Sequence, residues 1–332
     1  MTPPLGAACL VLMYHRVAAP ATDPWKLCVS PARLAEHLDV LRAHAEVVPL
    51  SGLVEAADAL GTGAAARPTV ALTFDDGYVD NLLVAKPLLE TSGLPATVFV
   101  ATGYLGGERQ FWWDELAGLL LAPRTLPPSL TLVIGGVTYH WTLGDAAGYS
   151  EADAERDRAW RALETPPTAR HALFVELWGL LKPASRPRQQ YLLNVLRGWA
   201  ATPLVGQPPD RAVTPAELRA LAAGGLIDIG AHTVTHPILE GLPAPVQLAE
   251  MRESKARLEE LLDRPIDSFA YPYGAAGPDT VQLVADAGFR CACTTMAGTV
   301  RRAADPFRLP RFTVEDWDGG EFLRQLSRWS HE

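Results

Sequence analysis

Short apolar runs rich in β-branched residues alternate with helical patterns along most of the chain. The runs with strand character span 9–14, 46–50, 69–74, 96–101, 226–231, 268–271, 291–295 and 311–314. Apolar residues recur at helical spacing in 30–44, 79–93, 214–225, 246–263 and 278–288, and Ser30 is a candidate N-cap for the first of these segments. Strands that alternate with helices form β/α units around a parallel sheet, and the number of strands predicts a barrel.

This alternation breaks between residues 105 and 210. The segment 129–143 has the pattern of a β-hairpin, with Gly135 and Gly136 as its turn, and helical stretches follow at 151–163 and 169–181. Insertions after the carboxyl end of a barrel strand usually lie over the active site. We therefore expect one domain, 1–332, with a mixed α/β insertion at 105–210 that forms a cap.

Composition narrows the function classes. The 332 residues are 48% hydrophobic and 20% charged, as in globular proteins. The net charge is −9, and the sequence contains no block of basic residues of the kind typical of nucleic-acid binding. No apolar run approaches the roughly 18 residues of a membrane span. The first residues contain no basic side chain before Arg16 and no clear cleavage site, so we expect a core strand there rather than a secretion signal, and a cytoplasmic protein.

Reactive side chains follow four of the predicted strands directly. His15 follows the first, Asp75 and Asp76 the third, His232 and His236 the fifth, and Tyr273 the sixth. In a β/α barrel the carboxyl ends of all strands lie on one face, where active sites form. We therefore expect these side chains to converge.

The spacing of two histidines suggests a metal site. His232 and His236 are four residues apart, which brings both imidazoles to one point if the segment turns helically. Zinc is commonly bound by two imidazoles and one carboxylate. Taken singly, the aspartate pair could be a helix cap followed by a solvated carboxylate. The two histidines could be surface residues whose spacing arose by chance. Together at one barrel face, they favour a metal.

Three motifs, TFDDG (73–77), HTVTHP (232–237) and FAYPYG (269–274), resemble those of the polysaccharide deacetylase family, the carbohydrate esterase family 4 or NodB-like group. The resemblance covers roughly 9–104 and 211–316. It implies a distorted (β/α)7 TIM-like barrel and metal-dependent removal of the acetyl group from an N-acetylated sugar.

The resemblance also implies roles for individual residues. Asp76, His232 and His236 match the metal ligands of the family, and Asp75 matches its catalytic base. The backbone N–H of Tyr273 matches the family's donor to the oxyanion. The resemblance therefore also implies that Tyr273 contacts the substrate. Zn²⁺ is favoured by two histidines and one aspartate, and Co²⁺, Ni²⁺ or Fe²⁺ also fit this set.

The chain departs from the family pattern twice. Ala270 stands where the third motif usually has an arginine that orients the base; Arg311 could supply that guanidinium or could be an ordinary surface residue. The late Leu-x-His motif that supplies the general acid is not evident. His15 is the candidate acid, and the alternative is a structural histidine beneath the metal.

The insertion opens with Trp112 and Trp113, which could stack on a sugar ring or could form the core of the insertion itself. The expected substrate is a free, nucleotide-linked, lipid-linked or oligomeric N-acetylated amino sugar. The alternatives are an amidase or imidase acting on a non-sugar C–N bond, and a catalytically impaired sugar-binding relative. The sequence leaves the oligomeric state open.

Overall fold

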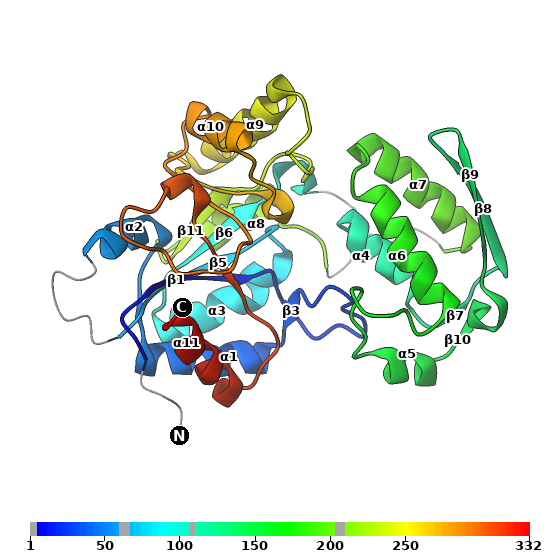
Figure 1. Ribbon diagram of the computed structural model, residues 1–332, viewed down its shortest axis with the longest axis horizontal. Coiled ribbons are helices and arrows are strands. Elements are labelled where there is room, and N and C mark those ends of the chain that lie inside the picture. The colour runs from blue at the N-terminus through cyan, green and yellow to red at the C-terminus, as the bar shows by residue number, and fades with distance from the viewer. Residues whose placement is uncertain (1–4, 60–66, 107–109, 203–209) are drawn as a thin grey trace. The chain divides into compact units, whose positions relative to one another are not determined.

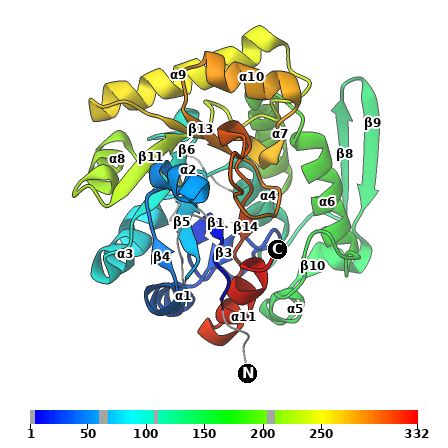
Figure 2. The same ribbon diagram turned by 60° about the vertical axis from the view of Figure 1, so that its left-hand side comes forward.

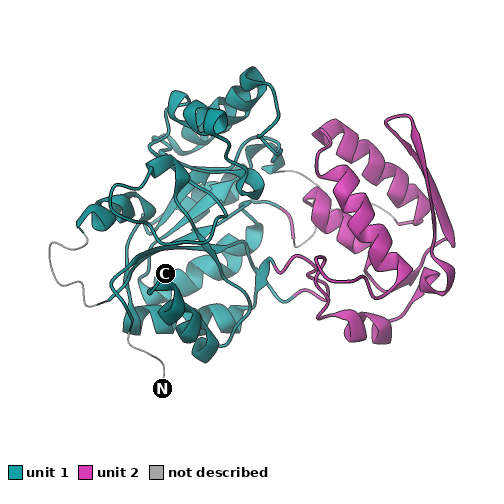
Figure 3. Ribbon diagram, viewed as in Figure 1, with its two compact units in different colours: residues 1–19, 27–107, 212–332 teal, residues 20–26, 108–211 magenta. Residues whose placement is uncertain are grey.

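The computed structural model describes residues 5–59, 67–106, 110–202 and 210–332. The chain divides into two compact units (Figure 3). The first unit comprises 1–19, 27–107 and 212–332, and the second comprises 20–26 and 108–211. Each unit is described by itself below.

A curled, parallel sheet forms the centre of the first unit (Figure 1). Its strands follow the order β13 (Cys291–Cys293), β12 (Ser268–Ala270), β11 (Ile227–Ala231), β6 (Ala96–Val100), β5 (Thr69–Phe74), β1 (Cys9–Tyr14) and β14 (Phe312–Thr313), and β4 (Glu46–Val47) pairs with β5. Each of the eight predicted runs supplies one of these strands. Every residue of β1 and β5 is buried, because a parallel sheet is covered on both faces.

The barrel closes through one short segment near the C-terminus, which we call the seam (residues 309–313). Leu309 forms an isolated parallel bridge with Cys293 at the end of β13. Three residues later, Phe312 pairs with Leu12 of β1. The chain thus changes partner within the seam, and Arg311 lies at the change. The predicted distorted barrel is confirmed.

Helices cover the sheet. They are α1 (Pro31–His44), α2 (Leu50–Ala59), α3 (Lys86–Ser92), α8 (Pro215–Ala222), α9 (Ala244–Leu262), α10 (Pro278–Asp286) and α11 (Gly319–Trp329), and one π-helical turn, Asn81–Ala85, precedes α3. Helices α9 and α10 lie side by side (Figure 2). The five predicted helices are confirmed, whereas α2 and α11 were not predicted. Ser30 precedes α1 as expected, but its hydroxyl donates to Asp316 Oδ1 at 2.8 Å instead of capping the helix.

The second unit contains the predicted hairpin and a small helical core. Its elements are α4 (Trp112–Leu120), β7 (Arg124–Thr125), β8 (Ser129–Ile134), β9 (Val137–Thr142), β10 (Gly148–Tyr149), α5 (Glu151–Asp157), α6 (Ala169–Leu181) and α7 (Arg186–Trp199). Ile134 pairs with Val137 across the Gly135-Gly136 turn. The fully buried Arg170 donates to the backbone carbonyls of Leu120, Ala122, Arg124, Ala146 and Ala147.

The boundaries of this unit lie within a few residues of the predicted insertion, 105–210. Segment 20–26 also belongs to it, and Trp25 packs on Trp178 with ring centroids 4.2 Å apart. That the unit caps the active site stays a prediction. Within the described ranges, no helix combines the length and the apolar character needed to cross a bilayer.

Gly230, two residues before His232, is packed too tightly for a side chain. A Cβ there would lie 2.4 Å from the Phe99 ring and 2.6 Å from Ser268 Oγ. We predict that Gly230→Ala destabilises the protein by about 1–3 kcal/mol, because the strand or the ring must move. Equilibrium urea unfolding measures the change.

Gly179→Ala is the matched control. Gly179 lies inside helix α6 with open space where a Cβ would stand. The same substitution there should stabilise the protein by about 0.5–1 kcal/mol, since alanine favours a helix. Equal effects of the two substitutions would contradict the packing argument.

Candidate active site

Asp75 and Asp76 are neighbours in sequence but serve different partners. The Asp75 N–H donates to Tyr14 O at 3.0 Å and continues the pairing of β5 with β1. Asp76 then adopts a left-handed conformation with φ 73°, and Gly77 follows with φ 76°. This turn directs the Asp75 carboxylate towards Arg311 and the Asp76 carboxylate towards the two histidines.

The loop after β11 brings both histidines to Asp76, but not by a helical turn. Thr233 and His236 adopt left-handed φ values of 67° and 58°. The His236 N–H donates to Thr233 Oγ1 at 3.0 Å, and the two imidazole centroids lie 4.8 Å apart. The predicted convergence is therefore correct, while the assumed helical geometry is wrong, because Thr233 and His236 have left-handed φ values that a right-handed helix does not contain.

Backbone strain is concentrated around this site. Eight described residues other than glycine have a positive φ. Four of them belong to the site: Asp76, Thr233, His236 and Tyr273. Such conformations cost about 1–3 kcal/mol each and persist only where surrounding contacts enforce them.

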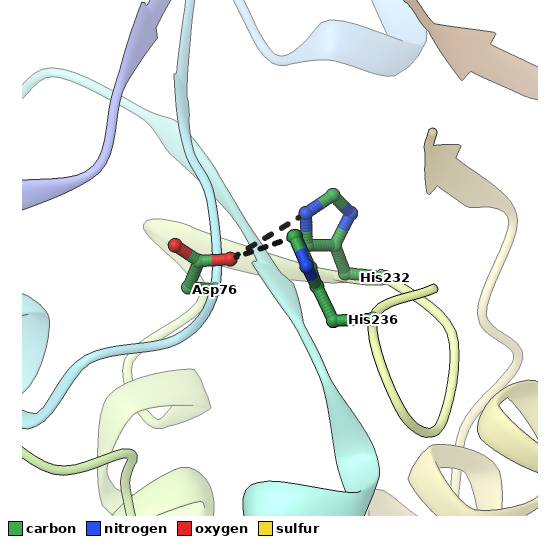
Figure 4. A group of neighbouring side chains, drawn as sticks. All are labelled: Asp76, His232 and His236. Carbon is green, nitrogen blue, oxygen red and sulfur yellow. Dashed lines mark ion pairs between the residues drawn. The ribbon is translucent and has the colours of Figure 1, made fainter. Parts of the chain in front are cut away.

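The side chains of Asp76, His232 and His236 form a buried three-residue cluster (Figure 4). Asp76 Oδ1 lies 3.6 Å from His232 Nε2 and 3.4 Å from His236 Nε2. Tetrahedral zinc with bonds of about 2.0–2.2 Å separates neighbouring ligand atoms by about 3.4 Å. The cluster therefore fits a divalent metal in spacing and in chemistry.

The protonation of the histidines also suits metal binding. His232 Nδ1 donates to the carbonyl of Ala270 at 2.7 Å, which leaves the lone pair on Nε2, the atom that faces Asp76. Burial lowers the pKa of both His232 and His236 below the usual value. Both imidazoles are thus neutral at pH 7 and able to bind a cation.

Arg311 binds Asp75 through two parallel hydrogen bonds. Nη1 donates to Oδ1 and Nη2 to Oδ2, both at 2.7 Å, and the arginine is fully buried. Its Nε also donates to Thr294 O, and Nη1 to Thr73 Oγ1. Arg311 thus supplies the guanidinium that Ala270 cannot, and the surface-residue alternative is wrong. Sequence reasoning gave Thr73 no role although it opens the TFDDG motif, and it missed Thr294, which contacts Arg311 through its backbone carbonyl and lies in no motif.

This pair determines the charge of the candidate base. Burial opposes ionisation of Asp75, but the positive charge and hydrogen bonds of Arg311 outweigh it. The pKa of Asp75 therefore lies well below its ordinary value. Asp75 is a carboxylate at neutral pH.

His15 lies beside Asp75, with Nε2 at 4.0 Å from Asp75 Oδ2 and 19% of its side chain exposed. Its carbonyl accepts a hydrogen bond from Asn81 Nδ2 at 2.9 Å, which fixes the backbone after β1. Burial lowers the pKa of His15 to about 4, although Asp75 acts in the opposite direction. His15 is therefore neutral at pH 7.

The other candidates lie in two places. The Tyr273 ring lies edge-on to His236, with centroids 4.7 Å apart, so this residue borders the metal cluster. Trp112 and Trp113 lie in α4 of the second unit, 3% and 6% exposed, and pack on each other and on Phe111 and Trp178. The core of that unit accounts for both tryptophans, and contact with substrate stays a prediction.

Comparison with known proteins agrees with this geometry. A family model described as "Polysaccharide deacetylase" matches residues 62–121 and 191–292. These stretches include Asp75, Asp76, His232, His236 and Tyr273, but neither His15 nor Arg311. A putative polysaccharide deacetylase, YxkH of Bacillus subtilis, is 28% identical over 102 residues, which cover 31% of this chain and 36% of the relative.

Solved structures share the fold across the whole chain. IcaB from Ammonifex degensii matches with a TM-score of 0.59 and 19% identity, covering 100% of both chains. The Streptococcus pyogenes deacetylase PplD, in complex with acetate, matches with a TM-score of 0.57 and 18% identity, covering 98% of this chain and 99% of its own. Because the two identities are only 19% and 18%, the likeness shows a shared fold alone.

We predict that Arg311→Met destabilises the metal-free protein by about 3–5 kcal/mol, because it leaves the Asp75 charge buried without a partner. The double variant Asp75→Asn/Arg311→Met should recover part of this loss, since no buried charge remains. Urea unfolding of the four proteins of the cycle measures the coupling.

Arg290→Met is the control for the loss of an arginine. The Arg290 side chain is 82% exposed and lies 3.4 Å from Asp267, so the change should be within about 0.5 kcal/mol. If the changes in unfolding free energy of Asp75→Asn and Arg311→Met simply added in the double variant, the dependence of Asp75 on Arg311 would be contradicted.

Proposed function

Because the chain belongs to the polysaccharide deacetylase family, we propose that it is a metal-dependent hydrolase that removes the N-acetyl group from an N-acetylated amino sugar and releases acetate and a free amine. The observation that carries the proposal is that a possible metal-binding cluster and an ionised carboxylate lie side by side in the structure. The three-ligand cluster of Asp76, His232 and His236 lies next to a carboxylate that Arg311 keeps ionised.

Asp75 is the proposed general base. A divalent metal bound at the cluster would supply Lewis acidity, lowering the pKa of water and polarising the amide carbonyl. Asp75 accepts the proton of the attacking water, and its carboxylate lies near enough to the proposed ligand His232 for the charges of the two groups to interact. The two hydrogen bonds from Arg311 hold the carboxylate in one orientation during this transfer.

The departing amine must gain a proton, and His15 is the proposed acid. A neutral imidazole is too weak an acid to protonate the amine, so His15 must first receive a second proton within the reaction. Asp75 Oδ2, 4.0 Å from His15 Nε2, is the proposed source. The proton taken from water would then leave with the amine by way of His15.

The backbone N–H of Tyr273 is the proposed donor to the oxyanion. Tyr273 has φ 58° and ψ 7°, an unusual conformation for a tyrosine, and its ring borders His236. Gly274 makes this turn possible, because a Cβ there would lie 1.9 Å from Thr295 Oγ1. A donor fixed in such a turn needs no rearrangement as charge develops on the oxygen.

The proposed substrate class rests on the family and on one structural relative. Acetate, present in the PplD complex, is the product expected from an N-acetylated substrate. The proposed substrate is an N-acetylated amino sugar that is free, linked to a nucleotide, linked to a lipid or part of an oligosaccharide. The proposed metal is Zn²⁺, because two imidazoles and one carboxylate suit it, with Co²⁺, Ni²⁺ or Fe²⁺ as substitutes.

We predict that Asp75→Asn lowers acetate release by about 10²–10⁴-fold while metal content stays near that of wild type, because the base is lost and the ligands are retained. Asp76→Asn should lose both metal and activity. Metal analysis and an acetate assay on the same preparations separate the two outcomes.

Asp279→Asn, an exposed change on α10, is the control for the loss of a carboxylate. Retention of full activity by Asp75→Asn would remove Asp75 from the mechanism.

A substrate panel tests the reaction class. We expect acetate release from N-acetylated amino sugars and no opening of cyclic ureides or imides. Treatment with a chelator should abolish the release, and added Zn²⁺ or Co²⁺ should restore it. Turnover of imides alone would favour the amidase alternative, and metal binding without any turnover would favour an impaired sugar-binding relative.

A further inference from the structure

The loop that carries the two histidines is attached to helix α9 through a single carboxylate. Glu250 Oε2 accepts the backbone N–H groups of Val234 and Thr235, both at 2.8 Å. Glu250 Oε1 accepts the Thr235 hydroxyl at 2.6 Å. One side chain thus receives three hydrogen bonds from two consecutive residues between His232 and His236.

The opposite side of the same loop is held by backbone. The N–H of Thr102 donates to Thr233 O at 3.0 Å, and that of Gly103 donates to Val234 O at 2.8 Å. The carbonyls of the loop therefore bind the segment after β6, and its amides bind Glu250. Helix α9 contacts both β11 and the 102–104 segment, and Met251, next to Glu250, is fully buried, so the carboxylate comes from a fixed helix.

These contacts restrain a conformation that the loop would otherwise avoid. Thr233, a β-branched residue, and His236 both have left-handed φ values, which L-residues other than glycine rarely adopt. Without the bonds to Glu250, the loop could relax towards ordinary φ values. His236 would then move away from Asp76 Oδ1.

We propose that Glu250 is a positioning residue for the metal ligands: it holds the strained 233–236 loop so that His232 and His236 face Asp76. The proposal deepens the function proposed above and rests on its metal site. Glu250 binds neither metal nor substrate in this scheme. It acts through the backbone of the loop, as outer groups that orient metal ligands do.

Two substitutions separate the geometry of Glu250 from its charge. Glu250→Ala removes all three hydrogen bonds. Glu250→Gln retains a carbonyl oxygen for both backbone amides, and its NH₂ group can donate to Thr235 Oγ1 instead of accepting from it. Glu253→Ala, an exposed change on the same helix, is the matched control.

The experiment measures metal binding by the whole chain without any substrate. Competition against a chromophoric chelator gives the Zn²⁺ dissociation constant, and Co²⁺ loading gives a visible absorption spectrum that reports ligand geometry. We expect Glu250→Ala to weaken Zn²⁺ binding by about 10- to 100-fold and to change the Co²⁺ spectrum. Glu250→Gln should restore most of the affinity and the wild-type spectrum, and Glu253→Ala should match wild type.

General destabilisation is distinguished from positioning by temperature. At a temperature where each metal-free variant is more than about nine-tenths folded, a loss of stability alone leaves the measured affinity nearly unchanged. Wild-type affinity and spectrum in folded Glu250→Ala would overturn the positioning role and leave the proposed function intact. Failure of wild type to bind Zn²⁺ or Co²⁺ would overturn both.

Discussion

The buried ion pair between Asp75 and Arg311 is the interaction on which the site depends. It joins the carboxyl end of β5 to the seam that closes the barrel, and it gives the proposed base, Asp75, both its charge and its orientation. Burying two charges is costly, and the two matched hydrogen bonds offset that cost only while both partners are in place. The orientation of the proposed base and the closure of the barrel therefore both depend on residues of the seam.

The metal cluster depends on a different set of restraints. The proposed ligands lie on two strained turns. The turn that carries the histidines is held by contacts outside the cluster: the Ala270 carbonyl accepts a hydrogen bond from the His232 ring, and Glu250 accepts hydrogen bonds from the loop amides. In the histidine loop, hydrogen bonds from neighbouring elements thus offset the left-handed conformations of Thr233 and His236, which are not glycines. The three side chains of the cluster are already brought together by the fold, which would reduce the ordering cost of binding a metal.

The sequence predicted the sheet well, because each strand is a continuous apolar run with β-branched residues. It predicted the convergence of Asp76, His232 and His236, because strands of a parallel barrel end on one face. The left-handed turns were missed, since Thr233 and His236 carry none of the glycine signals that mark such backbone. Arg311 stayed ambiguous because its partner lies 236 residues away, and Glu250 was missed because its partners are backbone amides.

The position of Arg311 in the chain has a consequence for how the site matures. During synthesis the three family motifs leave the ribosome before residue 311 does. These motifs contain Asp75, Asp76, His232, His236 and Tyr273. Until the seam has been synthesised and has reached β1, the nascent chain holds a complete set of motif residues around a carboxylate without its counter-charge. A fragment ending after residue 292 would match the family model fully and still lack Arg311, the partner of the proposed base. A complete set of motifs is thus not a complete active site.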